Sequence, residues 1–174
     1  MSRTRFIAMS AAFAVVFAGR VAMADIIISE AAPWASSNSP YMADWFELTN
    51  TGGSAVDITG WKMDDNSAAF ATARDMRGVT SIAPGQSVVF IESGTDPLFD
   101  SAFESDFIAS WFGGSAPSGF ALGFYGGSGV GLSSSGDGVT IFDAGGSQVA
   151  AITFGASPGA APWTTFDNAA GAAG

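Results

Sequence analysis

The chain has 174 residues, with 16 acidic and six basic side chains and a formal net charge of −10 at pH 7. It contains neither histidine nor cysteine, which excludes imidazole bases, thiol nucleophiles, disulfide bonds and the usual zinc ligands. The acid excess also argues against a nucleic-acid partner, because such binding depends on Lys and Arg side chains at the phosphates.

Residues 1–24 have the pattern of a cleaved signal peptide. Two arginines precede an apolar run over residues 6–18, and Ala22 and Ala24 supply small side chains at the positions that signal peptidase reads. The run is shorter than the roughly 20 residues that cross a bilayer. We therefore expect an exported chain, secreted or held at the cell surface, whose mature form begins at Asp25 and has no membrane span. Three arginines leave with the signal, so three basic and 16 acidic residues remain, a net charge of −13.

The mature chain then shows short strands separated by turn residues, the pattern of an all-β sandwich. In residues 45–49, Phe46 and Leu48 alternate with the other side chains, which predicts a strand with these two on one face. Residues 50–53 have turn chemistry, since Asn and Gly both tolerate positive φ. Strands are predicted on this basis at 26–30, 45–49, 56–58 and 60–63.

The middle of the chain contains a loop and a buried strand. Residues 64–80 are polar and predict a loop with a weak strand near its end. Pro84 and Gly85 stand at the second and third positions of a type II turn. The apolar run 87–91 follows and predicts a central strand that is buried on both faces.

Residues 100–112 predict one helix. Apolar side chains recur at helical spacing from Phe103 to Trp111, and Ser101 with Glu104 has the spacing of a capping box. We expect this helix to cover an open end of the sandwich.

The last part of the chain is rich in glycine. Residues 115–135 predict one strand with close backbone approaches, because apolar residues alternate between positions 120 and 124. Residues 138–143 and 148–154 predict a closing hairpin. The prediction is therefore a single domain over residues 25–155, followed by a Gly/Ala/Pro-rich C-terminal tail over residues 156–174.

Four motifs between residues 26 and 154 carry a family resemblance. They are Trp45-x-Glu47-Leu48-x-Asn50-x-Gly52, Val56-Asp57-Ile58-x-Gly60-Trp61, Ile82-Ala83-Pro84-Gly85-Gln86, and Gly136-Asp137-Gly138-Val139-Thr140-Ile141-Phe142-Asp143. Together they resemble the lamin tail domain, which is found in nuclear lamins and in secreted bacterial proteins. The fold-defining positions on this resemblance are Trp45, Leu48, Gly60, Trp61, Pro84, Gly85 and Asp137.

The resemblance implies an all-β, immunoglobulin-like antiparallel β-sandwich, with the predicted helix in an insertion between residues 92 and 131. It also implies a non-catalytic module for protein contacts or surface attachment, with no catalytic residues and no cofactor. The partner expected from the resemblance is a protein or a surface glycan.

One metal site is a hypothesis from the residues themselves. Asp64, Asp65 and Asn66 offer the oxygen ligands that calcium takes. No EF-hand spacing surrounds them. The alternative interpretation is that these acidic side chains simply form part of a solvated surface. Lys62, the only lysine, is interpreted as an exposed strand charge. Residues 126–131 are interpreted as a strand edge, because they match neither common nucleotide-loop motif.

Two other classes of function fit the sequence. Paired carboxylates such as Asp44 with Glu47 would serve a polysaccharide hydrolase if two of them faced each other across a cleft. Aromatic side chains in or beside loops would serve a carbohydrate-binding module if they formed an exposed row. The aromatic residues in such positions are Trp34, Tyr41, Trp111, Phe112, Tyr125 and Trp163.

Overall fold

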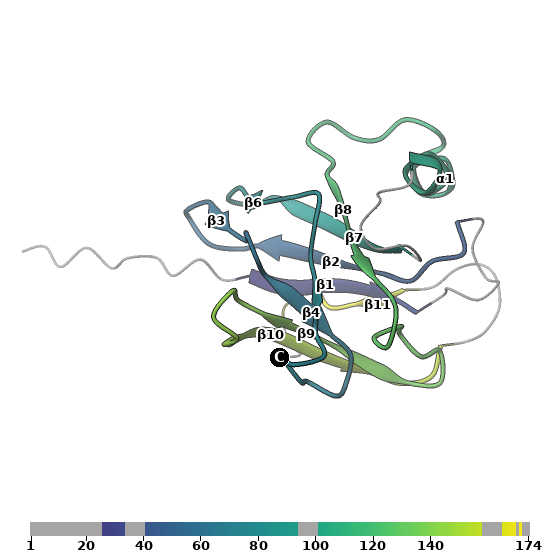
Figure 1. Cartoon of the computed structure of the whole chain (residues 1–174). Helices are drawn as coiled ribbons and strands as arrows, with labels where there is room; N and C mark the ends of the chain where they lie inside the picture. The colour runs from purple at the N-terminus through teal and green to yellow at the C-terminus, as the bar shows by residue number, and fades with distance from the viewer. Residues whose placement is uncertain (1–25, 34–40, 94–100, 158–164, 170, 172–174) are drawn as a thin grey trace, which may run out of the picture.

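The computed structural model describes residues 26–33, 41–93, 101–157, 165–169 and 171. Figure 1 shows two sheet layers facing each other, with a helix on the outside of one layer. The predicted signal peptide, residues 1–24, lies outside the described residues, as do Trp34 and Trp163. The described part confirms the predicted β-sandwich with one short helix.

The strands form two large sheets and one small one. The first sheet has the order β11-β1-β2-β7-β8, the second the order β10-β9-β4-β5, and the small sheet pairs β3 with β6. Their bounds are β1 Ile26–Ala32, β2 Trp45–Asn50, β3 Val56–Asp57, β4 Lys62–Asp64, β5 Arg74–Asp75, β6 Ser81–Ile82, β7 Ser87–Ser93, β8 Leu122–Gly126, β9 Asp137–Phe142, β10 Gln148–Phe154 and β11 Phe166–Asp167.

One strand pair departs from the antiparallel pattern. Val89 pairs with Leu122 and Ile91 with Phe124, so β8 runs parallel to β7, whereas the other pairs between described strands are antiparallel. The physical reason is the connection, because parallel neighbours need a crossover segment. The helix α1, Ser101–Phe112, lies in that crossover.

The main core lies between the two large sheets. Phe46 and Leu48 are fully buried on the inner face of β2, as their alternation predicted. The ring of Phe46 stacks on Phe90 with centroids 5.6 Å apart. Val139 and Ile141 of β9 complete the same cluster from the opposite sheet. This packing confirms that β7 is a central strand, since its residues 88–91 are all buried.

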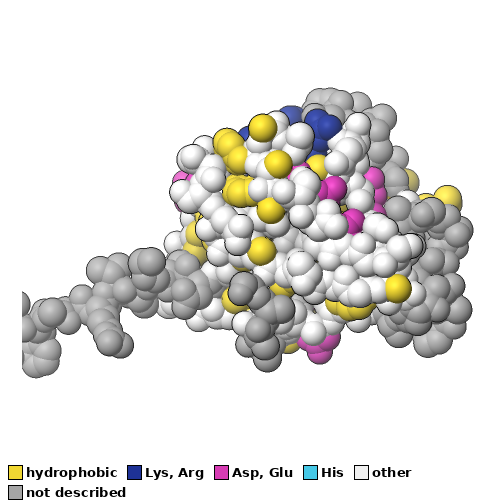
Figure 2. All heavy atoms as spheres, turned by 90° about the horizontal axis from the view of Figure 1, so that it is seen from below, with side chains coloured by type: hydrophobic (Ala, Val, Ile, Leu, Met, Phe, Trp, Pro, Cys, Tyr) yellow, Lys and Arg dark blue, Asp and Glu magenta, His cyan; other side chains and the backbone are white. Residues whose placement is uncertain are grey.

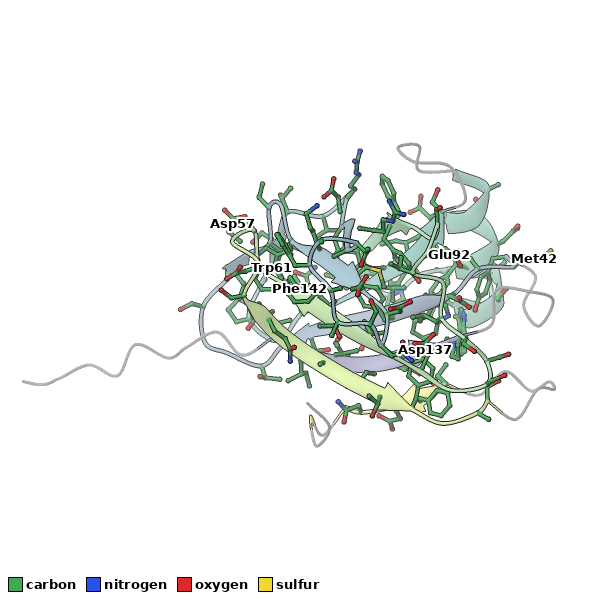
Figure 3. The ribbon with its side chains drawn as sticks, turned by 60° about the horizontal axis from the view of Figure 1, so that its bottom comes forward. Met42, Asp57, Trp61, Glu92, Asp137 and Phe142 are labelled. Atoms are coloured by element: carbon green, nitrogen blue, oxygen red, sulfur yellow. The ribbon has the colours of Figure 1, made fainter. Side chains whose placement is uncertain are left out.

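Trp61 and Met63 also belong to the main core, from the side of β4. Trp61 lies at the same end of the domain as Phe142, and Asp137 lies at the other end (Figure 3). Lys62, between Trp61 and Met63, forms an ion pair with Asp75 at 2.8 Å. Lys62 is thus a charged strand residue, as interpreted from the sequence, but its side chain is only 30% exposed and is ion-paired.

The helix covers a sheet face rather than the predicted open end of the sandwich. Phe107 is buried against Trp45 and Tyr41, with ring centroids 5.6 and 5.3 Å away. This second cluster lies on the outer face of β2 and β7, where Trp45 pairs with Ile91 across the strands. Trp45 points outward because it alternates with the inward-facing Phe46. The helix side chains Phe107, which is buried, and Trp111, which is partly buried, pack there against the outward-facing residues of β2 and β7.

Two further expectations change in the structure. Tyr125 was predicted to lie in or beside a loop, but it is a strand residue of β8 and is fully buried in the main core. Within the predicted tail, Phe166–Asp167 forms β11 and pairs with Glu30 and Ala31 of β1. Phe166 stacks on Phe154 with centroids 4.8 Å apart, so packing on the core holds this short strand in place.

Candidate functional site

The motif residues shape turns and anchor the core. Asn50 accepts a hydrogen bond from the Gly52 N–H at 2.9 Å and donates one to the Ile82 carbonyl at 2.9 Å, which joins two turns. Gly85 adopts φ +71°, as the type II turn after the exposed Pro84 requires. Gly60 also adopts a positive φ, +74°, immediately before Trp61. These residues shape the turns of the domain and present no reactive group, and their role as fold-defining positions stays a prediction.

The predicted calcium residues lie at one tight turn after β4. Asp64 is fully buried, and its carboxylate accepts hydrogen bonds from the Ser67 hydroxyl at 2.5 Å and the Ala69 N–H at 2.7 Å. Asp65 accepts from the Ser67 N–H at 2.8 Å. The Asn66 N–H donates to Asp137 at 3.2 Å. The structure brings the three residues together as a loop cap, and calcium binding there stays a prediction.

Two other buried carboxylates also stabilise loops, by accepting hydrogen bonds from backbone N–H groups. Asp44 accepts the Leu132 N–H at 2.9 Å. Asp137 accepts the Ser133 N–H at 2.7 Å and the Gly138 N–H at 2.8 Å. These bonds tie residues 132–133, which directly follow the insertion, to Asp44 beside the first sheet and to Asp137 of the second sheet. Within the described residues, no group of three or more acidic side chains is placed to hold a metal ion.

One polar side chain in the core lacks a hydrogen-bond partner. The hydroxyl of Tyr125 is fully buried and, among the described residues, is not within hydrogen-bond reach of any acceptor. Burial raises its pKa well above the ordinary value, and the charges of Asp44, Glu92 and Asp137 raise it further. The tyrosine is therefore neutral at physiological pH.

A stripe of hydroxyl and carboxylate groups crosses the outer face of the first sheet. Ser29 donates to Glu47 at 2.6 Å and lies 2.8 Å from the Thr49 hydroxyl. Thr49 lies 2.6 Å from the Ser87 hydroxyl on the next strand. A β-bulge between Ile28 and Glu30 turns both Ser29 and Glu30 to this face. Sequence reasoning missed this polar stripe, because its members meet only through the strand register.

Three carboxylates stand in register at the edge of the stripe. Glu30 of β1 is the cross-strand partner of Glu47 on β2 and of Asp167 on β11. Partial burial raises the pKa of Glu30, a hydrogen bond from the Thr165 hydroxyl opposes that rise, and the charges of Glu47 and Asp167 add to it. Like charges directly opposite each other destabilise a strand pair. The edge is therefore sensitive to the protonation of Glu30.

A shallow depression lies at the opposite end of the stripe. It has a volume of about 610 Å³ and is lined by residues 83–87 and 118–120. Ser87 belongs to both features, since it lines the depression and bonds to Thr49. One wall is the Pro84–Gly85 turn, and the other wall is the part of the insertion that follows α1. The depression and the polar stripe together form the candidate binding surface.

The aromatic residues predicted for sugar binding are used in packing where the structure describes them. The Tyr41 hydroxyl accepts hydrogen bonds from the indole N–H groups of Trp45 at 3.0 Å and Trp111 at 2.8 Å. Phe112 is 36% exposed, but its ring packs against Phe120 with centroids 5.1 Å apart. These contacts place the aromatic rings in the cluster under α1 rather than in an exposed row.

Comparison with known proteins gives one result. Residues 21–156 match the lamin tail domain family. A comparison with curated proteins finds no match. In the described part of the chain, the helix is too short to cross a membrane.

Proposed function

Because the chain belongs to the lamin tail domain family and has its immunoglobulin-like β-sandwich, we propose that it is an exported, non-catalytic module that makes protein contacts. The observation that carries the proposal is the use of the buried carboxylates. Asp44, Asp64 and Asp137 each accept N–H groups of neighbouring loops, so these acids stabilise loops instead of facing a substrate.

The depression beside the polar stripe is the contact surface that we propose. The Pro84–Gly85 turn, which belongs to a motif of the family, forms one wall, and residues 118–120 of the insertion form the other. The surface therefore combines a shared feature of the family with the segment in which this chain departs from the family pattern. The neighbouring hydroxyl and carboxylate groups offer hydrogen-bond donors and acceptors at the rim. A shallow, partly apolar surface with a polar rim suits a protein partner better than a small molecule.

A capture experiment tests this function. The mature chain is immobilised and exposed to the extracellular fraction of the culture that makes it. Ser118→Arg fills the depression from its exposed wall, and Ser135→Arg adds the same charge in an exposed turn elsewhere. We expect one set of proteins to be retained by the natural chain and by Ser135→Arg but lost with Ser118→Arg. Retention that is equal for all three chains would refute the proposed surface.

Two control assays separate the alternative classes. Retardation of the chain in gels that contain soluble polysaccharides would favour a carbohydrate-binding module. Release of reducing ends from those polysaccharides would favour a hydrolase. Neither is expected from the packing of the described aromatic rings and the hydrogen bonding of the buried acids.

Export is part of the same proposal and has its own measurement. The proposal is supported by the basic start, the apolar run over residues 6–18 and the small residues Ala22 and Ala24. The intact mass of the secreted protein should correspond to a chain that begins at Asp25. A mass that includes residues 1–24 would contradict a cleaved signal peptide.

A further inference from the structure

We propose that β10 pairs edge to edge with β10 of a second copy of this chain. This contact goes beyond the function proposed above, because it uses the second sheet and leaves the depression on the first sheet open. The argument begins from the outer strands of the two large sheets.

Both edges of the first sheet are partly covered by other described segments of the chain. On the β1 side, β11 pairs with Glu30 and Ala31, and the Asn168 backbone N–H donates to the Ser29 carbonyl at 2.7 Å. On the β8 side, Arg77 and Phe124 exchange two backbone hydrogen bonds of 2.9 and 3.0 Å. These contacts occupy several of the backbone groups that an incoming strand would need.

The second sheet has one short, charged edge and one long, uncharged edge. Its outer strand β5 has only two residues, Arg74 and Asp75, and Asp75 forms ion pairs with Lys62 and Arg77. The opposite outer strand, β10, has seven residues and no charged side chain or proline. Within the described residues, β9 is the only strand paired with β10. Edge strands of natural proteins usually carry Lys, Pro or a cover against pairing, and β10 has only a bulge between Gln148 and Ala150.

The absence of charge on β10 favours a second copy as the partner. The chain carries a net charge of −10, so most approaches of two copies bring acidic groups together. The side of the molecule that includes β9 and β10 shows Asp and Glu side chains only in small groups, among white and hydrophobic areas (Figure 2). Two β10 edges can therefore meet without placing acidic groups in the seam. A cationic partner would gain nothing from this edge.

The side chains of β10 also suit antiparallel pairing with themselves. A two-fold axis at Ala151 would place Ala150 of one copy opposite Ile152 of the other, and would bring the bulge residue Val149 near Thr153 of the other copy. β-Branched pairs across strands stabilise a sheet, and the small Ala150 and Ala151 permit close approach. Val149 is 37% exposed, and Thr153 is exposed on the same strand. The seam is short, so we expect a weak, concentration-dependent dimer.

The test is the oligomeric state of the mature chain, measured by analytical ultracentrifugation over a concentration series. Higher salt should strengthen the dimer, because screening reduces the repulsion between two acidic copies. Thr153→Lys places one lysine on each of the two paired edges, the kind of residue that natural edge strands use against pairing, and should weaken the dimer at least about tenfold. Thr80→Lys makes the same change at an exposed position outside β10 and should leave the dimer intact.

Three results would overturn the proposal. The first is a chain that stays monomeric at every concentration and salt level. The second is a dimer that Thr153→Lys does not weaken. The third is a dimer that Thr153→Lys and Thr80→Lys weaken equally, because the contact would then respond to net charge and would not involve the β10 edge. Circular dichroism of both variants shows whether each remains folded.

Discussion

Replacing Gly123 with alanine tests the position of the inserted strand β8 in the fold. An added Cβ would lie 2.4 Å from Cε1 and 2.6 Å from Cδ1 of Phe90, and 2.7 Å from the carbonyl oxygen of Arg77. Phe90 is fully buried and stacked on Phe46, so its ring has no space to retreat. The Arg77 carbonyl is held by the Phe124 N–H at 3.0 Å. Neither neighbour can yield without disturbing a sheet.

The expected cost is at the upper end of the range for overpacking, about 3 kcal/mol. For a chain of this length, that cost lowers the melting temperature by roughly 6–12 °C. The measurement is a thermal melt followed by circular dichroism, supported by urea denaturation to obtain the free energy of unfolding. The matched control is Gly155→Ala, because no atom lies within 4 Å of the Cβ added at Gly155.

A Gly123→Ala protein that melts at the same temperature as Gly155→Ala would refute this reasoning. It would mean that β8 does not pack against Phe90 and the Arg77 backbone in solution. The parallel β7–β8 pair and the depression beside residues 118–120 depend on that packing, so the candidate binding surface would also lose its basis.

The other predictions concern the core and the acidic edge. Trp61→Ala removes a side chain that is only 8% exposed and should lower the free energy of unfolding by about 3–5 kcal/mol in urea denaturation, and no change would show that Trp61 lies outside the core. Tyr125→Phe removes a buried hydroxyl with no partner among the described residues, so we expect a change between zero and about 2 kcal/mol of stabilisation, and a clear loss of stability would mean that the hydroxyl is bonded. The pKa of Glu30 is raised in the folded chain, so its contribution to stability is greatest below its ordinary value of 4.5 and is lost as pH rises through the raised pKa. Glu30→Gln should therefore reduce the loss of stability as pH rises from 4.5 to 7, and an unchanged pH profile would contradict this linkage.

The sequence alone was sufficient to predict the longer strands and the turns between them, because these depend on local chemistry. It missed the two-residue strands β5 and β11, which fall in the predicted loop and the predicted tail. The alternation of Phe46 and Leu48 predicted the inner face of β2, and the helix α1 lies within the range that its apolar spacing indicated. The family resemblance rested on motif residues such as Asn50 and Gly85, which make the turns seen in the structure. The match to the lamin tail domain family confirms that resemblance.

The tertiary structure decided where the elements pack and which side chains meet. Trp45 and Tyr125 show the limit of local reasoning, since Trp45 packs under a helix on the outer sheet face and Tyr125 lies between the sheets. The polar stripe and the row of Glu47, Glu30 and Asp167 depend on strand register over long sequence separations. The periodicity of apolar side chains and the chemistry of turns are properties of a few neighbouring residues. Strand register and the packing of the layers instead depend on how the whole chain buries as much apolar surface as it can.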